Sequence, residues 1–139
     1  MFNINYLALF VAAIAAFAVG AIWFGPKTFF PVWWTLQGRK PEDAAGSGNV
    51  GLMFGLTFVA QFAMGFAVAL VLKLEELAGV AVNVGTGLQV GLLLGVFVAA
   101  AASLSHRLFA GHGYRVWLLE VGNDIAAVVV MGLILGAWR

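Results

Sequence analysis

Apolar residues dominate four long stretches of the chain, and short polar stretches separate them. A helix needs about 20 mostly apolar residues to cross the hydrocarbon core of a bilayer. The pattern therefore predicts transmembrane helices at residues 4–24, 50–72, 84–105 and 116–138. Because the connections are short, we expect an all-α integral membrane fold: a four-helix transmembrane bundle with up-down-up-down topology, in which residues 1–139 form one transmembrane domain.

Residues typical of helix ends bound these stretches. Gly25 and Pro26 follow the first, the charged run 73–76 follows the second, and a Gly-His-Gly turn at 111–113 precedes the fourth. The first stretch lacks a basic leading region and is longer than the apolar region of a signal peptide. We therefore expect it to remain in the protein as a helix.

The longest connection, between the first two spans, has two parts. Residues 27–36 are dense in aromatic side chains, which predicts a short segment lying in the membrane interface. Residues 38–49 are polar and rich in glycine and alanine, which predicts a mobile turn. The aromatic part is either a contact for lipid or a partner, or a plain interfacial anchor of the kind general in membrane proteins.

Tryptophan prefers the headgroup level of a bilayer. Trp117 and Trp138 lie 21 positions apart, and this separation corresponds to about 32 Å of helix, close to one hydrocarbon thickness. We expect the five tryptophans to be interfacial anchors: Trp23, Trp33, Trp34, Trp117 and Trp138.

The composition agrees with a membrane protein. Hydrophobic residues make up 63% of the chain and charged residues only 9%, too apolar a balance for an ordinary soluble fold. A net charge of +1 without a basic patch makes nucleic acid an unsuitable partner. The chain has no cysteine, so it has neither disulfides nor thiolate chemistry.

The distribution of Lys and Arg predicts the orientation, because cytoplasmic loops carry the excess of these residues. One side of the membrane would hold Lys73 and Arg139, and the other side would hold Lys27, Arg39, Lys40, Arg107 and Arg115. We therefore expect a multi-pass protein of the cell inner membrane with both termini outside the cytoplasm.

Small residues recur at four-residue spacing in every predicted span, and such stripes let helix backbones approach closely in lipid. The stripes are Ala12, Ala16 and Gly20; Gly51 and Gly55; Gly87, Gly91 and Gly95; and Gly132 and Gly136. Four helices can satisfy some of these faces within one chain. The surplus favours a homo-oligomer or docking against another membrane subunit.

The fourth span carries polar residues that are costly in a membrane and therefore mark a candidate functional site. Glu120 and Asp124 lie four residues apart on one helical face, with Asn123 beside the second. Possible partners at the same end of the bundle are His106, Arg107, His112 and Arg115. Three interpretations stay open. The first is proton or cation handling by Glu120 and Asp124 with His106 as relay. The second is a structural clamp in which Arg107 or Arg115 pairs with Glu120 and Asp124 bonds a neighbouring helix, and the third is contact with a partner subunit.

Specific motifs for metal binding and catalysis are absent from the sequence. The spacing of His106, His112, Glu120 and Asp124 matches no ligand pattern, so we expect no metal site. There is no phosphate-binding loop, metalloprotease motif or nucleophile elbow, so we expect no enzyme activity. The sequence does not indicate a cofactor. Other polar residues within spans are more often packing devices: Thr57, Gln61, Gln89 and Ser103.

The chain resembles a family of small bacterial membrane proteins of unknown function with four predicted spans. The resemblance lies in the opening Asn3-Ile4-Asn5-Tyr6-Leu7-Ala8, continuing through Ala12-Ala13 to Gly20-Ala21-Ile22-Trp23-Phe24-Gly25-Pro26, and in the closing residues 130–138. It implies the four-helix architecture and no particular activity. Members of that family tend to be uncharged in the fourth span, often with Asn-Ala-Gly-Tyr. Glu120, Asn123 and Asp124 depart from that pattern, which implies a specialised contact in this chain.

Together these features predict a non-enzymatic membrane protein that acts by helix–helix association, either as a homo-oligomer or as a small accessory subunit of a larger membrane complex. The alternative is a small channel or a proton- or cation-coupled transporter that uses Asp124 and Glu120. Such a protein needs a water-accessible path.

Overall fold

A computed structural model describes residues 2–45 and 48–139, and its regular structure is entirely helical over that part of the chain. Four helices are long and apolar enough to span a membrane: α1 (Tyr6–Trp23), α3 (Val50–Leu77), a third helix over Val84–Phe109, and α6 (Gly113–Ala137). The third helix consists of α4 (Val84–Leu94), a π-helical segment (Gly95–Ala100) and α5 (Ala101–Phe109). The prediction of an all-helical membrane protein with four spans is confirmed.

The helices differ in length from the predicted spans. Helix α3 continues to Leu77 instead of ending at residue 72, and the third helix continues to Phe109 instead of residue 105. Helix α6 begins at Gly113, three residues before the predicted start. The reason is that apolarity marks the part of a helix that matches the bilayer, whereas Lys, Glu and Arg extend a helix readily beyond it.

Asparagine side chains begin three of the spanning helices by accepting hydrogen bonds from backbone N–H groups that the helix leaves free. The Oδ1 atoms of Asn5 and Asn49 each accept from the residue three positions on, at 3.0 Å. Asn83 accepts from Gly85 and Thr86, and the Thr86 hydroxyl accepts from the Asn83 N–H, which completes a capping box.

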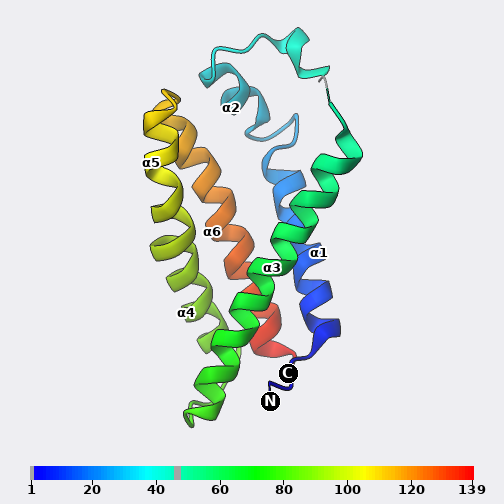
Figure 1. Cartoon of the computed structure of the whole chain (residues 1–139), viewed down its shortest axis with the longest axis vertical. Coiled ribbons are helices and arrows are strands. Elements are labelled where there is room, and N and C mark those ends of the chain that lie inside the picture. Colours follow the sequence, from blue (N-terminus) through cyan, green and yellow to red (C-terminus); the bar gives the residue numbers. More distant parts are fainter. Residues whose placement is uncertain (1, 46–47) are drawn as a thin grey trace.

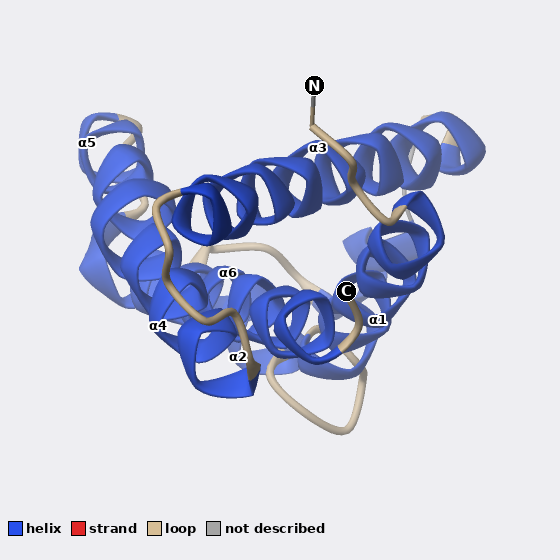
Figure 2. Ribbon diagram, turned by 90° about the horizontal axis from the view of Figure 1, so that it is seen from below, coloured by secondary structure: helices blue, strands red, loops and turns tan. Residues whose placement is uncertain are grey.

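Both termini lie at one end of the bundle, and the connection between α1 and α3 lies at the other (Figure 1). We call the half near the termini the terminal half. We call the other half the α2 half, after the short helix α2 (Phe30–Leu36) that lies there. Helix α6 contacts α1, α3 and α4. Viewed from the terminal end, α3 runs obliquely across the other helices (Figure 2).

The core lies in the terminal half. Its fully buried large side chains include Leu9 of α1, Leu72 of α3 and Met131 of α6. The first buried residue of α3 is Gln61. Before it, only one side of the helix is covered, where the rings of Phe54 and Phe58 contact Phe17 of α1. Helix α5 has no buried residue.

A seam of glycines joins α4 to α6 in the terminal half. A Cβ atom added to Gly87 would collide with the backbone carbonyl of Gly132, and one added to Gly132 would collide with the carbonyl of Gly87. One turn further along, a Cβ at Gly91 would lie 2.8 Å from the Cα of Val129. The two backbones are therefore in direct contact, and only glycine fits between them.

The connection between α1 and α3 contains two short helices. The aromatic segment predicted at residues 27–36 is helical only from Phe30, because the Thr28 hydroxyl donates to backbone carbonyls of Trp23 and Gly25 and forms a turn. The segment predicted as a polar turn contains a 3-10 helix, Pro41–Ala45. Gly46 and Ser47 of that segment lie outside the described residues.

Candidate functional site

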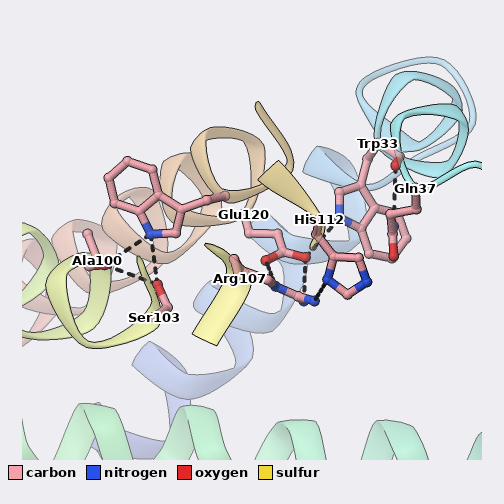
Figure 3. Close-up of polar contacts among 8 residues, drawn as sticks. Trp33, Gln37, Ala100, Ser103, Arg107, His112 and Glu120 are labelled. Atoms are coloured by element: carbon pink, nitrogen blue, oxygen red, sulfur yellow. Dashed lines mark hydrogen bonds and ion pairs between the residues drawn. The ribbon is translucent and has the colours of Figure 1, made fainter. Parts of the chain in front are cut away.

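An ion pair between α5 and α6 is the centre of the polar cluster in the α2 half. The Arg107 guanidinium donates from Nε to Glu120 Oε2 and from Nη2 to Glu120 Oε1, both at 2.5 Å (Figure 3). The side chain of Glu120 is 16% exposed and that of Arg107 is 32% exposed. Such a paired, partly buried contact fixes the orientation of both planar groups.

The side chains of Trp33 and His112 also contact this ion pair. The Trp33 indole N–H of α2 donates to Glu120 Oε1 at 3.0 Å, and the Gln37 amide donates to the Trp33 carbonyl at 3.2 Å. Arg107 Nη1 lies 3.0 Å from His112 Nδ1. Because a guanidinium only donates, the Nδ1 atom of His112 is the acceptor. The cluster thus ties α2, α5 and α6 together (Figure 3).

The turn between α5 and α6 brings Arg107 and Glu120 together. Gly111 and Gly113 both have φ of +78°, a conformation that side chains disfavour, and they reverse the chain within a few residues. Arg107 lies in the last turn of α5, where a positive charge also interacts favourably with the helix dipole.

A second tryptophan bonds the helix next to the π-helical segment. The Trp117 indole N–H lies 3.1 Å from both the Ala100 carbonyl and the Ser103 hydroxyl. The Ser103 hydroxyl itself donates to the Ala100 carbonyl at 3.1 Å (Figure 3). This contact joins α6 to α5 one helical turn from the Arg107–Glu120 pair.

An open pocket of about 500 Å³ lies beside the ion pair. Its lining residues come from α2, α5, α6 and the residue that follows α1: Phe24, Trp33, Ser103, His106, Arg107, Glu120 and Asp124. The rings of Phe24 and Trp33 lie 5.1 Å apart. Asp124 is half-buried and forms no ion pair with any described residue. It is therefore the acidic side chain of the pocket that lacks an ion-pair partner among the described residues.

The structure brings together four of the six candidate residues from the fourth span and its neighbours. Glu120, Asp124, His106 and Arg107 line the same pocket. Arg115 is exposed and does not pair with Glu120. The buried Asn123 side chain turns toward α1, where its Oδ1 lies 3.6 Å from the position of a Cβ at Gly20.

Four of the five tryptophans predicted as interfacial anchors use their indole N–H within the chain. Besides Trp33 and Trp117, Trp23 donates to the Leu119 carbonyl at 2.8 Å, and Trp34 donates to the Lys40 carbonyl at 2.7 Å. Trp138 is 42% exposed in the terminal half. The other four tryptophans therefore join segments of the α2 half, a function in addition to any contact with lipid headgroups.

Within residues 2–45 and 48–139, no three His, Asp or Glu side chains converge in a way that could hold a metal ion. The two histidines in the cluster differ in their surroundings. His112 is bonded to Arg107, whereas His106 lines the pocket without a hydrogen bond from another described side chain.

Sequence reasoning missed the contacts of Trp33 and Trp117 with the cluster and the π-helical segment. The positions of the tryptophans in the sequence indicate their depth in the membrane. They do not indicate which acceptor each indole N–H bonds to, because that depends on which groups the fold brings within reach. The sequence over Gly95–Ala100 contains only small and apolar residues, so nothing in it distinguishes a π-helix from an α-helix.

The fold and the cluster define a multi-pass helical membrane protein with a polar pocket at one end of its bundle. The family model described as "Protein of unknown function (DUF1761)" matches residues 7–136. The chain therefore belongs to this family, which carries no assigned function. No curated protein and no solved structure matches the chain.

Proposed function

We propose that this protein is a non-enzymatic membrane protein that acts by helix–helix association, and that its partner is a second copy bound through the first half of α3. The observation that carries this proposal is that some glycine stripes face another helix of the same chain and one does not. Gly87, Gly91, Gly132 and Gly136 meet another helix of the same chain, whereas a Cβ added to Gly55 meets nothing within 4 Å. At Gly51 an added Cβ meets only Asn49, the cap of its own helix.

Helix α3 exposes further small residues, about a third of a turn around the helix from the Gly51–Gly55 stripe. Ala60, Ala63 and Ala67 are exposed, whereas Gln61, Gly65 and Val68, on the opposite face, are buried. In lipid, association depends on close packing and on polar contacts, so exposed small residues favour a helix neighbour. A Gly-x-x-x-Gly groove is complementary to itself, which fits a two-fold contact between identical chains.

The test is the mass of the particle in lipid nanodiscs. The unchanged protein should form a dimer, and Gly51→Leu/Gly55→Leu should form a folded monomer, because an added Cβ at these positions collides with no other helix of the chain. Ala102→Leu, at an exposed position of α5, is the control and should remain dimeric. A monomeric unchanged protein would contradict the proposal, and another polypeptide in fixed ratio would make the protein an accessory subunit instead.

We also propose that the α2 half faces the cytoplasm. Five of the seven Lys and Arg residues lie in its two connections or their flanking turns: Lys27, Arg39, Lys40, Arg107 and Arg115. Since the chain has no cysteine, single cysteines report position cleanly. In intact cells, an impermeant thiol reagent should label Ala78→Cys in the α3–α4 turn and not Glu42→Cys. The reverse labelling would place the termini in the cytoplasm.

A small ion-coupled transporter is the second candidate. Asp124 favours it, because this side chain is half-buried in a span and has no ion-pair partner within residues 2–45 and 48–139. Asp124→Asn would abolish flux in reconstituted vesicles while the bundle still assembles. If flux is absent from the unchanged protein as well, this candidate is excluded.

A further inference from the structure

One acidic side chain of the pocket has no ion-pair partner among the described residues. Arg107 and Glu120 neutralise one another through two hydrogen bonds at 2.5 Å. Asp124 lines the same pocket without an ion-pair partner among the described residues. An unpaired carboxylate within a membrane span is costly, and a bound cation with one positive charge would offset that cost.

The aromatic wall of the pocket indicates which kind of cation fits. Phe24 and Trp33 both line it, with their ring centroids 5.1 Å apart and their planes inclined by 59°. Aromatic faces attract ammonium groups, including fully methylated ones. The hydrogen bond from Trp33 to Glu120 holds the indole in place, so this wall exists before a ligand arrives.

The size and donor set of the pocket disfavour a bare metal ion. Its volume is about 500 Å³. A metal ion prefers several converging ligands, and the described residues contain no group of three His, Asp or Glu side chains that could supply them. The combination of one free carboxylate with an aromatic wall suits an organic cation better.

We propose that this pocket binds a substituted ammonium group, with Asp124 as the counter-ion and Phe24 and Trp33 as the aromatic wall. This chemistry is shared by free alkylamines and by the ethanolamine and choline headgroups of lipids. The pocket lies in the α2 half, at the end of the bundle where α2 lies, which suits either source.

The test measures binding of tetramethylammonium by calorimetry to the full chain in phosphatidylglycerol nanodiscs. Saturable binding is expected, and Asp124→Asn should weaken it roughly tenfold or more through loss of the counter-ion. Asp43→Asn makes the same chemical change at an exposed position outside the pocket and should bind normally. Equal binding by the two variants, or no saturable binding by the unchanged protein, would overturn the proposal.

Further measurements test the aromatic wall, the kind of cation and the source of the ammonium group. Phe24→Leu removes an aromatic face while keeping an apolar side chain, so it should weaken binding several-fold even if Asp124→Asn does not fold. Potassium at the same concentration should not displace tetramethylammonium; equal displacement would mean a site for inorganic cations and refute the ammonium assignment. Weaker binding in phosphatidylethanolamine nanodiscs would identify the lipid headgroup as occupant, and unchanged binding would identify a free amine.

Discussion

The two halves of this bundle are held together in different ways. In the terminal half, α4 and α6 touch backbone to backbone at Gly87 and Gly132, and the core side chains around Met131 are fully buried. In the α2 half, long polar side chains span the gaps between helices, as Arg107 does in reaching Glu120. Backbone contact along the glycine seam leaves no room for a ligand between α4 and α6, whereas the bridging side chains of the α2 half leave a pocket beside them.

This contrast follows from the forces available in lipid. Apolar side chains gain little by leaving one apolar neighbour for another, so helices associate through dense packing or through polar contacts. The glycine seam of the terminal half uses the first device, and the Arg107–Glu120 cluster of the α2 half uses the second. We therefore expect the terminal half to determine stability and the α2 half to carry binding.

The largest expected effect is at the glycine seam. Gly132→Val should destabilise the bundle by about 3 kcal/mol, because the added side chain would collide with the Gly87 carbonyl. Denaturant titration in detergent micelles measures this loss. Gly55→Val, where no atom lies within 4 Å, is the matched control and should retain nearly full stability. If both variants lost a similar amount of unfolding free energy, close backbone contact at the seam would not be the cause of the destabilisation.

A smaller effect is expected at the ion pair of the α2 half. Glu120→Gln and Arg107→Gln should each cost about 2 kcal/mol, since each leaves a partly buried charge without its partner. The double variant should cost clearly less than the sum, because the second change removes the stranded charge. The free energies of unfolding of the two single variants and the double variant give the coupling free energy between Arg107 and Glu120. Arg115→Gln, at an exposed position, should change little; strict additivity would mean the contact contributes nothing.

The smallest expected effect is at Trp117. Trp117→Phe keeps the ring but removes the N–H that bonds to Ala100 and Ser103, at an expected cost of about 1 kcal/mol. Amide hydrogen exchange over residues 95–105 should accelerate. Trp138→Phe is the control, because that side chain is 42% exposed in the other half. Unchanged exchange in Trp117→Phe would show that the indole does not hold this segment.

The membrane-spanning pattern was predictable from the sequence, because bilayer thickness dictates how many apolar residues a span needs. Arg107 and Arg115 both remained possible partners of Glu120. Only Arg107 pairs with it, and that choice depends on how α5 is rotated about its axis. Likewise, Gly51–Gly55 and Gly87–Gly91 have the same spacing, but only the second pair faces a helix of this chain. Spacing identifies a possible contact face, whereas the arrangement of helices decides whether it is occupied.

The π-helical segment Gly95–Ala100 sets the register between the two halves. A π-bulge acts as one residue inserted into an α-helix, and one residue corresponds to a rotation of about 100° about the helix axis. The same helix can therefore present Gly87 and Gly91 to α6 before this segment and Ser103 and Arg107 to α6 after it. In an uninterrupted α-helix, Arg107 would be turned about a quarter of the circumference away from Glu120. Deleting a single residue of this segment should therefore give an ordinary α-helix in which Arg107 still faces Glu120, whereas straightening the segment without a deletion would separate the ion pair.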